Sequence, residues 1–464
     1  MRPTLPLLLA ALGVLAGCAS VPADDALAGA REWSQRVDAP APVLATTDEQ
    51  RAEQRALRER TLAEPLTEAG AVRLALLASP SMQALLADAW AAQVRAAQAG
   101  APPNPFFAFE RIVADGEVDI TRTLRIGLLE LLTLPQRRTL AQQTVDGLRL
   151  QLARDVLAHT SAVRQQWVRA VAAQQLVAYQ RHVRDAAEAS AELARRMQAV
   201  GNYSRLQRTR EQAFLADATA QLARAMAAAK SEREALVRLL GLDAGEAERL
   251  VLPERLADLP AAAKAADDVS RRAVADRLDL RVAALELAAA ERGKTLATVA
   301  PWDVELAGVS GSGGGESSRG VEIALPLPIF DPGTARRQAA SAQVLAAQAR
   351  LEQARADATS VLRERYVAYR TAYDLAAHYR DEVVPLARTV TDEMLLQYNG
   401  MLVGVFELLA EARAQVHAVI GAIEAQRDFW LADAALEAAV VGAPAAGAAL
   451  AAPSAAKAAA KGDH

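Results

Sequence analysis

Hydrophobic residues recur at helical spacing along two exceptionally long stretches of the chain. The first runs from Gln136 to Val200, and the second begins after Pro332 and continues to Asn399. A helix of the first length would measure roughly 100 Å at about 1.5 Å per residue. Such a helix must bury its apolar stripe against other long helices. The pattern therefore predicts a chain dominated by long, paired helices of coiled-coil type.

A seam on the second long helix supports this prediction. Leu362, Tyr366, Tyr369 and Tyr373 follow one another at intervals of four, three and four residues, which is the spacing of a coiled-coil contact line. We interpret the three tyrosines as packing residues and not as a binding site.

Four shorter segments lie between the helices, and three of them alternate apolar and polar residues with the period of a β-strand. The alternation is poor in the first segment, where Phe106, Phe107 and Phe109 are crowded together. The length and the two-sided pattern are typical of membrane-barrel strands. The glycine-rich stretch from Gly308 to Gly320 is expected to be the loop between the last two strands. The strands are expected at about 104–114, 119–131, 301–310 and 319–328.

The long helices belong to a two-fold internal repeat. The arginine pair beginning at Arg137 and the turn residue Gly201 both reappear 199 positions later, at Arg336 and Gly400. We therefore divide the chain into six parts. These are a lipoprotein signal peptide (1–17), a lipid anchor with an N-terminal extension (18–65), a first repeat (66–245), an inter-repeat linker (246–266), a second repeat (267–441) and a disordered alanine-rich tail (442–464).

The first residues determine the expected compartment. Arg2 is followed by the apolar run Leu5–Ala16, which is too short to span a membrane, and small residues precede Cys18. This is the general form of a secretory signal. It resembles the bacterial lipobox, in which the cysteine is lipidated and becomes the mature N-terminus. A buried or stray thiol at Cys18 is the less favoured interpretation.

Composition narrows the class of protein further. Hydrophobic residues make up 52% of the chain but aromatic residues only 4%, because alanine supplies much of the apolar share, and alanine favours helices. The net charge of −4 is too close to balance to indicate a nucleic-acid partner. After the signal no apolar stretch reaches about eighteen residues, so no transmembrane helix is expected. If the chain crosses a membrane, it must therefore do so as strands.

The order of these features resembles the TolC-like outer-membrane efflux proteins. The resemblance covers roughly residues 66–441 and depends most on the stretches 66–84, 322–337 and 398–430. Each stretch is a weak signal alone, but their order within a duplicated chain is specific. The chain looks closest to the lipoprotein branch associated with heavy-metal, copper and drug efflux, which leaves both metal ions and drugs open as cargo.

The resemblance implies a mainly α-helical homotrimer with a small membrane β-barrel. Three copies, each contributing four strands, would close a twelve-stranded barrel in the outer membrane of a Gram-negative bacterium, continued by a periplasmic α-helical barrel. This passive channel would bind a periplasmic adaptor protein and an inner-membrane efflux pump of the RND type. No cofactor is expected apart from diacylglycerol and N-acyl lipid on Cys18. The residues expected to face the barrel lumen are Arg125, Asp303, Glu305 and Glu322.

The same resemblance places the periplasmic tips of the channel at two helix turns. Glycine and asparagine suit the left-handed backbone of a helix end, so a purely structural role is one interpretation of these turns. The other is that the turns also dock the adaptor, and the two roles are compatible. The residues concerned are Gly201, Asn202 and Tyr203 in the first turn, and Gly400, Met401 and Leu402 in the second.

Two glutamates near the second turn are candidates for a pore gate. In the family a carboxylate commonly follows this turn by about two helical turns, and Glu407 fits that place approximately. The acidic residue often found three positions later is replaced by Ala410, with Glu411 beside it, which weakens the case for a second acidic ring. A solvated helix face is the alternative interpretation of Glu407.

Catalytic and metal-binding motifs are absent from the sequence. We find no zinc-protease, Walker A or nucleophile-elbow motif, and the five histidines and six methionines are scattered. We therefore predict neither an enzyme nor a metal site. The main alternative to a conduit is a non-conducting coiled-coil scaffold lipoprotein of the envelope, which would not account for the paired strands. A periplasmic hydrolase is less favoured still.

Overall fold

A computed structural model describes residues 21–114, 117–275, 277–299, 304–313, 316–327 and 329–443. The chain forms two compact units. Of the described residues, the sheet unit comprises those up to Gly29, Leu86–Leu152 and Asp279–Asp357, and the hairpin unit comprises Ala30–Leu85, Ala153–Leu278 and those from Ala358 to 443. The signal peptide, Cys18, Asp303 and most of the C-terminal tail lie outside the described residues.

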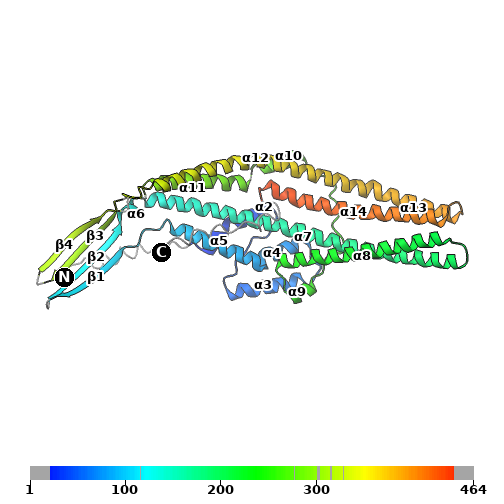
Figure 1. Cartoon of the computed structure of the whole chain (residues 1–464), viewed down its shortest axis with the longest axis horizontal. Coiled ribbons are helices and arrows are strands. Elements are labelled where there is room, and N and C mark those ends of the chain that lie inside the picture. Colours follow the sequence, from blue (N-terminus) through cyan, green and yellow to red (C-terminus); the bar gives the residue numbers. More distant parts are fainter. Residues whose placement is uncertain are drawn as a thin grey trace. The chain divides into compact units, whose positions relative to one another are not determined.

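The sheet unit contains one antiparallel four-stranded sheet in the order β1-β2-β3-β4 (Figure 1). Strands β1 (Phe106–Ala114) and β2 (Glu117–Gly127) form one hairpin. Strands β3 (Glu305–Gly313) and β4 (Glu316–Ala324) form the other. Because β2 pairs with β3, strands from the two halves of the sequence join in a single sheet.

The prediction of a loop from Gly308 to Gly320 is wrong. Strand β3 continues to Gly313, and β4 already begins at Glu316. A Cβ atom at Gly313 would lie 1.5 Å from Asp119 Oδ1, so its neighbour on β2 needs this space. Glycine in a strand often marks such a close approach. Because glycine has no side chain, the end of β3 lacks the apolar–polar alternation by which a strand is predicted from the sequence.

Helices complete the sheet unit. They are most of α5 (Pro80–Gln98), the short α6 (Leu128–Leu132), α11 (Leu278–Val299) and the first parts of α7 (Leu134–Ala199) and α12 (Thr334–His378). Strand β2 ends four residues earlier than the sequence predicted, because the chain turns into α6 after Gly127.

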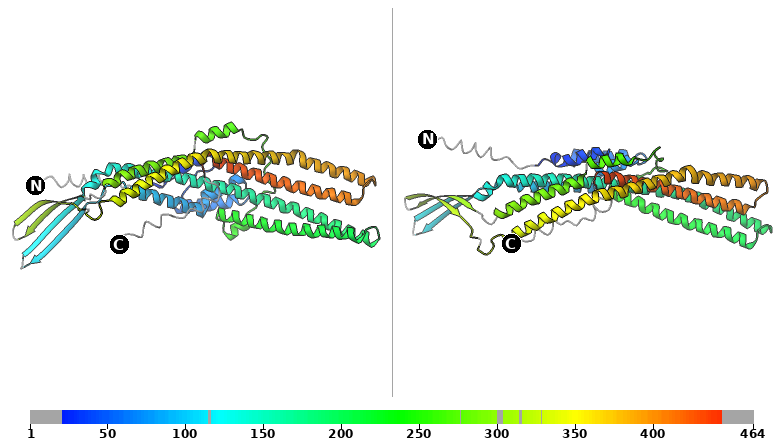
Figure 2. Two further views of the ribbon diagram at one scale, coloured as in Figure 1. Left: turned by 45° about the horizontal axis from the view of Figure 1, so that its top comes forward. Right: turned by 90° about the horizontal axis from the view of Figure 1, so that it is seen from above.

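The hairpin unit contains two helical hairpins. The first hairpin pairs the rest of α7 with α8 (Arg205–Leu240). In the second hairpin, α12 continues through the π-helical segment η1 (Tyr379–Val383) into α13 (Val384–Asn399), and α14 (Val405–Val440) returns. The views of Figure 2 show the two hairpins lying side by side.

The remaining helices are shorter. Their bounds are Ala23–Arg36 for α2, Asp48–Thr61 for α3, Glu68–Ala78 for α4, Ala244–Arg249 for α9 and Ala266–Ala275 for α10. Within the described ranges no single helix is both long and apolar enough to cross a membrane. Only the bent pair α4–α5 meets that test, on length and composition alone.

The tyrosine seam of α12 is a packing line, as predicted. Tyr369 and Tyr373 are buried, and each ring centroid lies 5.7 Å from that of Phe429 on α14. Their hydroxyl groups are also used, because Tyr373 donates to the Pro260 carbonyl oxygen at 3.1 Å and Tyr369 accepts from the Lys264 backbone N–H at 3.0 Å. The seam therefore packs the chain segment between α9 and α10, which lies within the inter-repeat linker (246–266), against the second hairpin.

Candidate functional site

The sheet has one predominantly polar face, and the predicted lumen residues lie on it. Side chains alternate along strands, and the register places Arg125, Ala307 and Glu322 opposite one another, with Glu305 one step along β3. Arg125 Nε lies 3.4 Å from Glu305 Oε2, and Arg125 Nη2 lies 3.9 Å from Glu322 Oε1. Three of the four predicted residues thus form one charge cluster across three strands, and the fourth, Asp303, lies outside the described residues.

The opposite face of the sheet is predominantly apolar near its helix end. One row across the strands contains Phe107, Leu124 and Val321, which are 62%, 57% and 75% exposed. Isolated apolar side chains on a protein surface need no explanation, but a contiguous exposed patch indicates an apolar partner or a membrane. The sheet therefore separates a polar face from a face suited to lipid.

The helix turns of the two hairpins have the same backbone geometry. In the first turn Gly201 adopts φ = 83°, and the Asn202 N–H donates to the Met197 carbonyl oxygen at 2.9 Å. In the second turn Met401 adopts φ = 57°, and the Leu402 N–H donates to the Gln397 carbonyl oxygen at 2.9 Å. Both are the 6→1 bonds of a Schellman helix end.

The structure corrects the expectation that Gly400 is the left-handed residue of the second turn. Gly400 has φ = −79°, and the strained position falls on Met401. The turns therefore correspond at a spacing of 200 residues, one more than the glycines suggest. A non-glycine residue in the left-handed region costs roughly 1 kcal/mol, so the second turn is locally less favourable than the first.

The tip residues differ in exposure. Val200, Met401 and Leu402 are 71%, 93% and 79% exposed. Tyr203 is 8% exposed, and its ring lies 4.9 Å from that of Phe406, centroid to centroid. Burial, with the nearby Glu211 and Tyr398, raises the pKa of Tyr203. Tyr203 thus joins the two tips from inside, while the other three side chains are free to meet a partner.

A buried ion pair, which sequence reasoning missed, also joins the two hairpins. The Glu211 side chain of α8 is 2% exposed, and its Oε2 accepts from Arg413 Nη2 of α14 and from Ser190 Oγ of α7, both at 2.7 Å. The Arg413 guanidinium also lies 4.1 Å from the Phe214 ring centroid. A carboxylate buried this deeply is stable only when it is paired. At the 200-residue spacing Glu211 is the counterpart of Glu411. This correspondence between the repeats is the one sequence signal that could have drawn attention to Glu211.

The two gate candidates have different surroundings. Glu407 is exposed in the first turn of α14, and Glu411 is half-buried one turn later. Among the residues that the structure describes, neither carboxylate makes an ion pair. Glu411 lies two residues before Arg413 along α14, and the role of both carboxylates as a gate stays a prediction.

A second charge cluster holds the linker. Lys264 Nζ contacts Asp433 and lies 2.7 Å from Glu437 Oε1, while Arg272 Nη2 lies 2.9 Å from Glu437 Oε2. These groups neutralise one another, and so the cluster is structural. No group of three metal-ligating side chains occurs in the part of the chain that the structure describes.

Comparison with known proteins finds similarity in structure alone. No protein-family model and no curated protein sequence matches the chain. The solved outer-membrane protein VceC from Vibrio cholerae aligns with a TM-score of 0.67 at 16% identity, covering 84% of this chain and 96% of that one. A membrane protein from Pseudomonas aeruginosa aligns with a TM-score of 0.67 at 20% identity, covering 87% and 98%. The CmeC outer-membrane channel of Campylobacter jejuni aligns with 0.66 at 12% identity, covering 85% and 86%.

The chain has the fold of the TolC-like outer-membrane channels. This agrees with the resemblance seen in the sequence, and the four-stranded sheet with mostly helical surroundings matches the TolC-like fold. The proteins that share this fold are channels and not enzymes.

Proposed function

We propose that the chain is the outer-membrane channel component of a tripartite efflux system. The observation that carries this proposal is the sheet, which combines a charged face with an exposed apolar face on strands of nine to eleven residues. Strands of this length with this alternation suit a membrane barrel. The TolC-like fold supports the same role.

Four strands cannot close a membrane barrel alone, because about eight is the usual minimum. A homotrimer would contribute twelve strands and would remove the open edges at β1 and β4. In this assembly the long helices form a periplasmic barrel, and Arg125, Glu305 and Glu322 line a water-filled lumen. Charges of both signs there predict a weakly selective, passive conduit for small molecules or metal ions.

The remaining parts of the system follow from this role. An inner-membrane pump of the RND type supplies the energy, and a periplasmic adaptor docks on the exposed tip residues Val200, Met401 and Leu402. Lipidation of Cys18 anchors the chain in the outer membrane. Mass spectrometry of the mature N-terminus tests the anchor, since a lipidated chain begins at Cys18, and an unlipidated one contradicts this part of the proposal.

The decisive experiment combines electron microscopy of the detergent-extracted protein with conductance in planar bilayers. We expect hollow particles with three-fold symmetry, banded by detergent at one end, and stable single-channel currents. A non-conducting coiled-coil scaffold would instead give solid rods or monomers without current, and this outcome would reject the channel.

A further inference from the structure

The four strands separate their charges by face. Among their described residues, the face that contains the lumen cluster holds one arginine and every carboxylate, while the apolar face holds three arginines and no carboxylate. The carboxylates are Glu110, Glu117, Asp119, Glu305, Glu316 and Glu322. The arginines of the apolar face are Arg111, Arg122 and Arg319.

The three arginines lie close together on neighbouring rows of the sheet. Arg122 and Arg319 share one row, on either side of Ser310. Arg111 is in the next row toward the hairpin ends, opposite Ile120. Strands about 4.8 Å apart and rows about 7 Å apart bring the three guanidinium groups within reach of one multivalent anion.

None of the three arginine side chains makes an ion pair or hydrogen bond with another residue that the structure describes, and all three are exposed. By contrast, Arg125 on the opposite face lies beside two carboxylates. A positive cluster without internal partners, set in an apolar surface, is suited to bind an anion from outside the chain.

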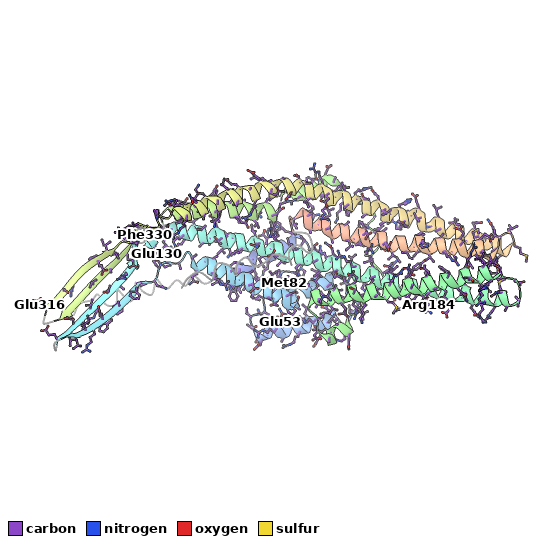
Figure 3. The ribbon with its side chains drawn as sticks, viewed as in Figure 1. Glu53, Met82, Glu130, Arg184, Glu316 and Phe330 are labelled. Atoms are coloured by element: carbon purple, nitrogen blue, oxygen red, sulfur yellow. The ribbon has the colours of Figure 1, made fainter. Side chains whose placement is uncertain are left out.

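The position of the cluster along the strands fits the upper boundary of a membrane. Apolar residues follow Arg319 at every second position, at Val321, Ile323, Leu325, Leu327 and Ile329, and all are exposed. Strand β4 itself ends at Ala324, so Val321 and Ile323 belong to the sheet, and the later members of the run follow it toward a turn in which the Ile329 N–H donates to the Leu327 carbonyl oxygen at 2.8 Å. Figure 3 shows Glu316 at the free end of the sheet and Phe330 at its opposite end, so the arginines lie toward the free end.

We infer that Arg111, Arg122 and Arg319 form a binding site for the phosphate groups of lipid headgroups in the outer leaflet. This inference depends on the proposed function, because it requires the apolar face of the sheet to meet lipid. Guanidinium groups bind phosphate oxygens in a bidentate manner, and at the boundary of the apolar band their side chains reach the headgroups. The site would hold phosphorylated lipid around the channel and fix the depth of the barrel.

The test measures binding of bis-phosphorylated lipid A to the detergent-purified full chain by native mass spectrometry, with dephosphorylated lipid A as the matched probe. We expect the phosphorylated lipid to bind far more tightly. The triple variant Arg111→Gln/Arg122→Gln/Arg319→Gln should weaken that binding roughly 100-fold, at about fivefold for each arginine. Inorganic phosphate should not displace the lipid, because it lacks the acyl chains that lie on the apolar band.

Two controls separate this site from general charge effects. Arg125→Gln removes a positive charge from the opposite face of β2, and Arg51→Gln/Arg55→Gln/Arg60→Gln removes three from α3, a helix without buried residues. Both should keep the lipid. Equal binding of the dephosphorylated lipid, displacement by inorganic phosphate, or undiminished binding by the triple variant would overturn the inference.

Conductance distinguishes this inference from the proposed function. Wild-type currents in neutral-lipid bilayers, together with undiminished lipid binding by the triple variant, would reject only the headgroup site. Absence of currents and of three-fold particles for the wild type would reject the channel itself. If the triple variant fails to assemble, the single variant Arg122→Gln serves instead, with an expected loss of about fivefold.

Discussion

The first and second helical hairpins have equal lengths and differ in what interrupts them. Helix α7 and the continuous stretch from Thr334 to Asn399 both contain 66 residues, and α8 and α14 both contain 36. Within the hairpin unit the two helices of the first hairpin contain no proline or glycine, whereas the helices of the second contain the π-helical segment η1, Pro385 and Gly421.

These interruptions meet at one level of the second hairpin. A Cβ atom at Gly421 would lie 2.7 Å from the Tyr379 ring, so α14 packs its backbone directly against the π-helical segment. Such segments and prolines are recognised causes of helix bending. The comparison teaches that two hairpins of the same size can differ in regularity, because every interruption of the hairpin helices within the hairpin unit falls in the second hairpin.

The largest effect is expected from breaking the ion pair that joins the hairpins. Arg413→Ala leaves the Glu211 carboxylate buried without its partner, and the expected loss is about 3 kcal/mol of unfolding free energy. Thermal unfolding of the detergent-solubilised protein measures it. Arg388→Ala, which removes an exposed arginine of α13, is the matched control and should change stability little. Equal stability of the two variants would show that the pair does not hold the hairpins together.

A bulky residue at Gly421 should disturb the second hairpin alone. Gly421→Leu forces the Tyr379 ring out of its place, at an expected cost of about 1–3 kcal/mol. Adding Tyr379→Ala should recover part of that loss, because it makes room for the new side chain. Gln221→Leu, at the corresponding position of α8, meets no such ring and should be tolerated. Denaturant unfolding measures the loss of unfolding free energy for each variant. Equal losses at positions 421 and 221 would contradict the comparison.

The two hairpins should hold the linker with different sensitivity to pH. Arg233 of α8 donates to the carbonyl oxygens of Ala247 and Leu250, at 2.6 and 2.7 Å. At the same position of α14 stands Asp433, which with Glu437 binds Lys264. Burial opposes ionisation of Glu437, but hydrogen bonds from Arg272 and Lys264 outweigh it and hold its pKa below the usual value of 4.5.

A depressed pKa fixes the direction of the pH effect. Below pH 4.5 the unfolded chain binds protons that the folded protein does not, so the stabilisation by Glu437 is present above that value and is lost as the pH falls through the folded pKa. Glu437→Gln should therefore cost about 1–2 kcal/mol at neutral pH and progressively less in acid. Arg233→Gln should have a cost independent of pH over the same range, because neither of its partners titrates. A Glu437→Gln cost that stays constant into acid would contradict the assignment.

The sequence predicted the elements whose signals are local. The first long helix was expected to end at Val200 and ends at Ala199, because a glycine in the left-handed conformation follows. Strand β3 was cut short because its glycines carry no side chains to alternate. The pairing of Glu211 with Arg413 joins residues 202 positions apart, and although the repeat relates Glu211 to Glu411, no local pattern identifies Arg413 as the partner of Glu211. The polar face of the sheet was found because alternation alone assigned Arg125, Glu305 and Glu322 to one side.

The smallest effect concerns the helix starts at the two tips. Ser204 caps α8 by accepting from the Gln207 N–H, while Gly404 begins α14 without a side-chain cap. Ser204→Ala should cost about 1 kcal/mol, and Gly404→Ser should add about a few tenths of a kcal/mol. The new Cβ would meet only the Glu407 side chain, whose Oε2 atom would lie 2.8 Å away, and that flexible side chain can turn to complete a capping box.

Thermal unfolding of Gly404→Ser and Gly404→Ala, measured side by side, distinguishes the effect of the serine hydroxyl on stability from the effect of the added Cβ atom. The serine variant should be the more stable of the two, since only it offers the Glu407 N–H an acceptor. If both variants lose stability equally, the Glu407 side chain cannot turn away from Gly404. The Glu407 side chain would then be fixed in the position that the structure shows. In that case the second tip would require glycine at position 404, and the absence of a side-chain cap on α14 would follow from that requirement.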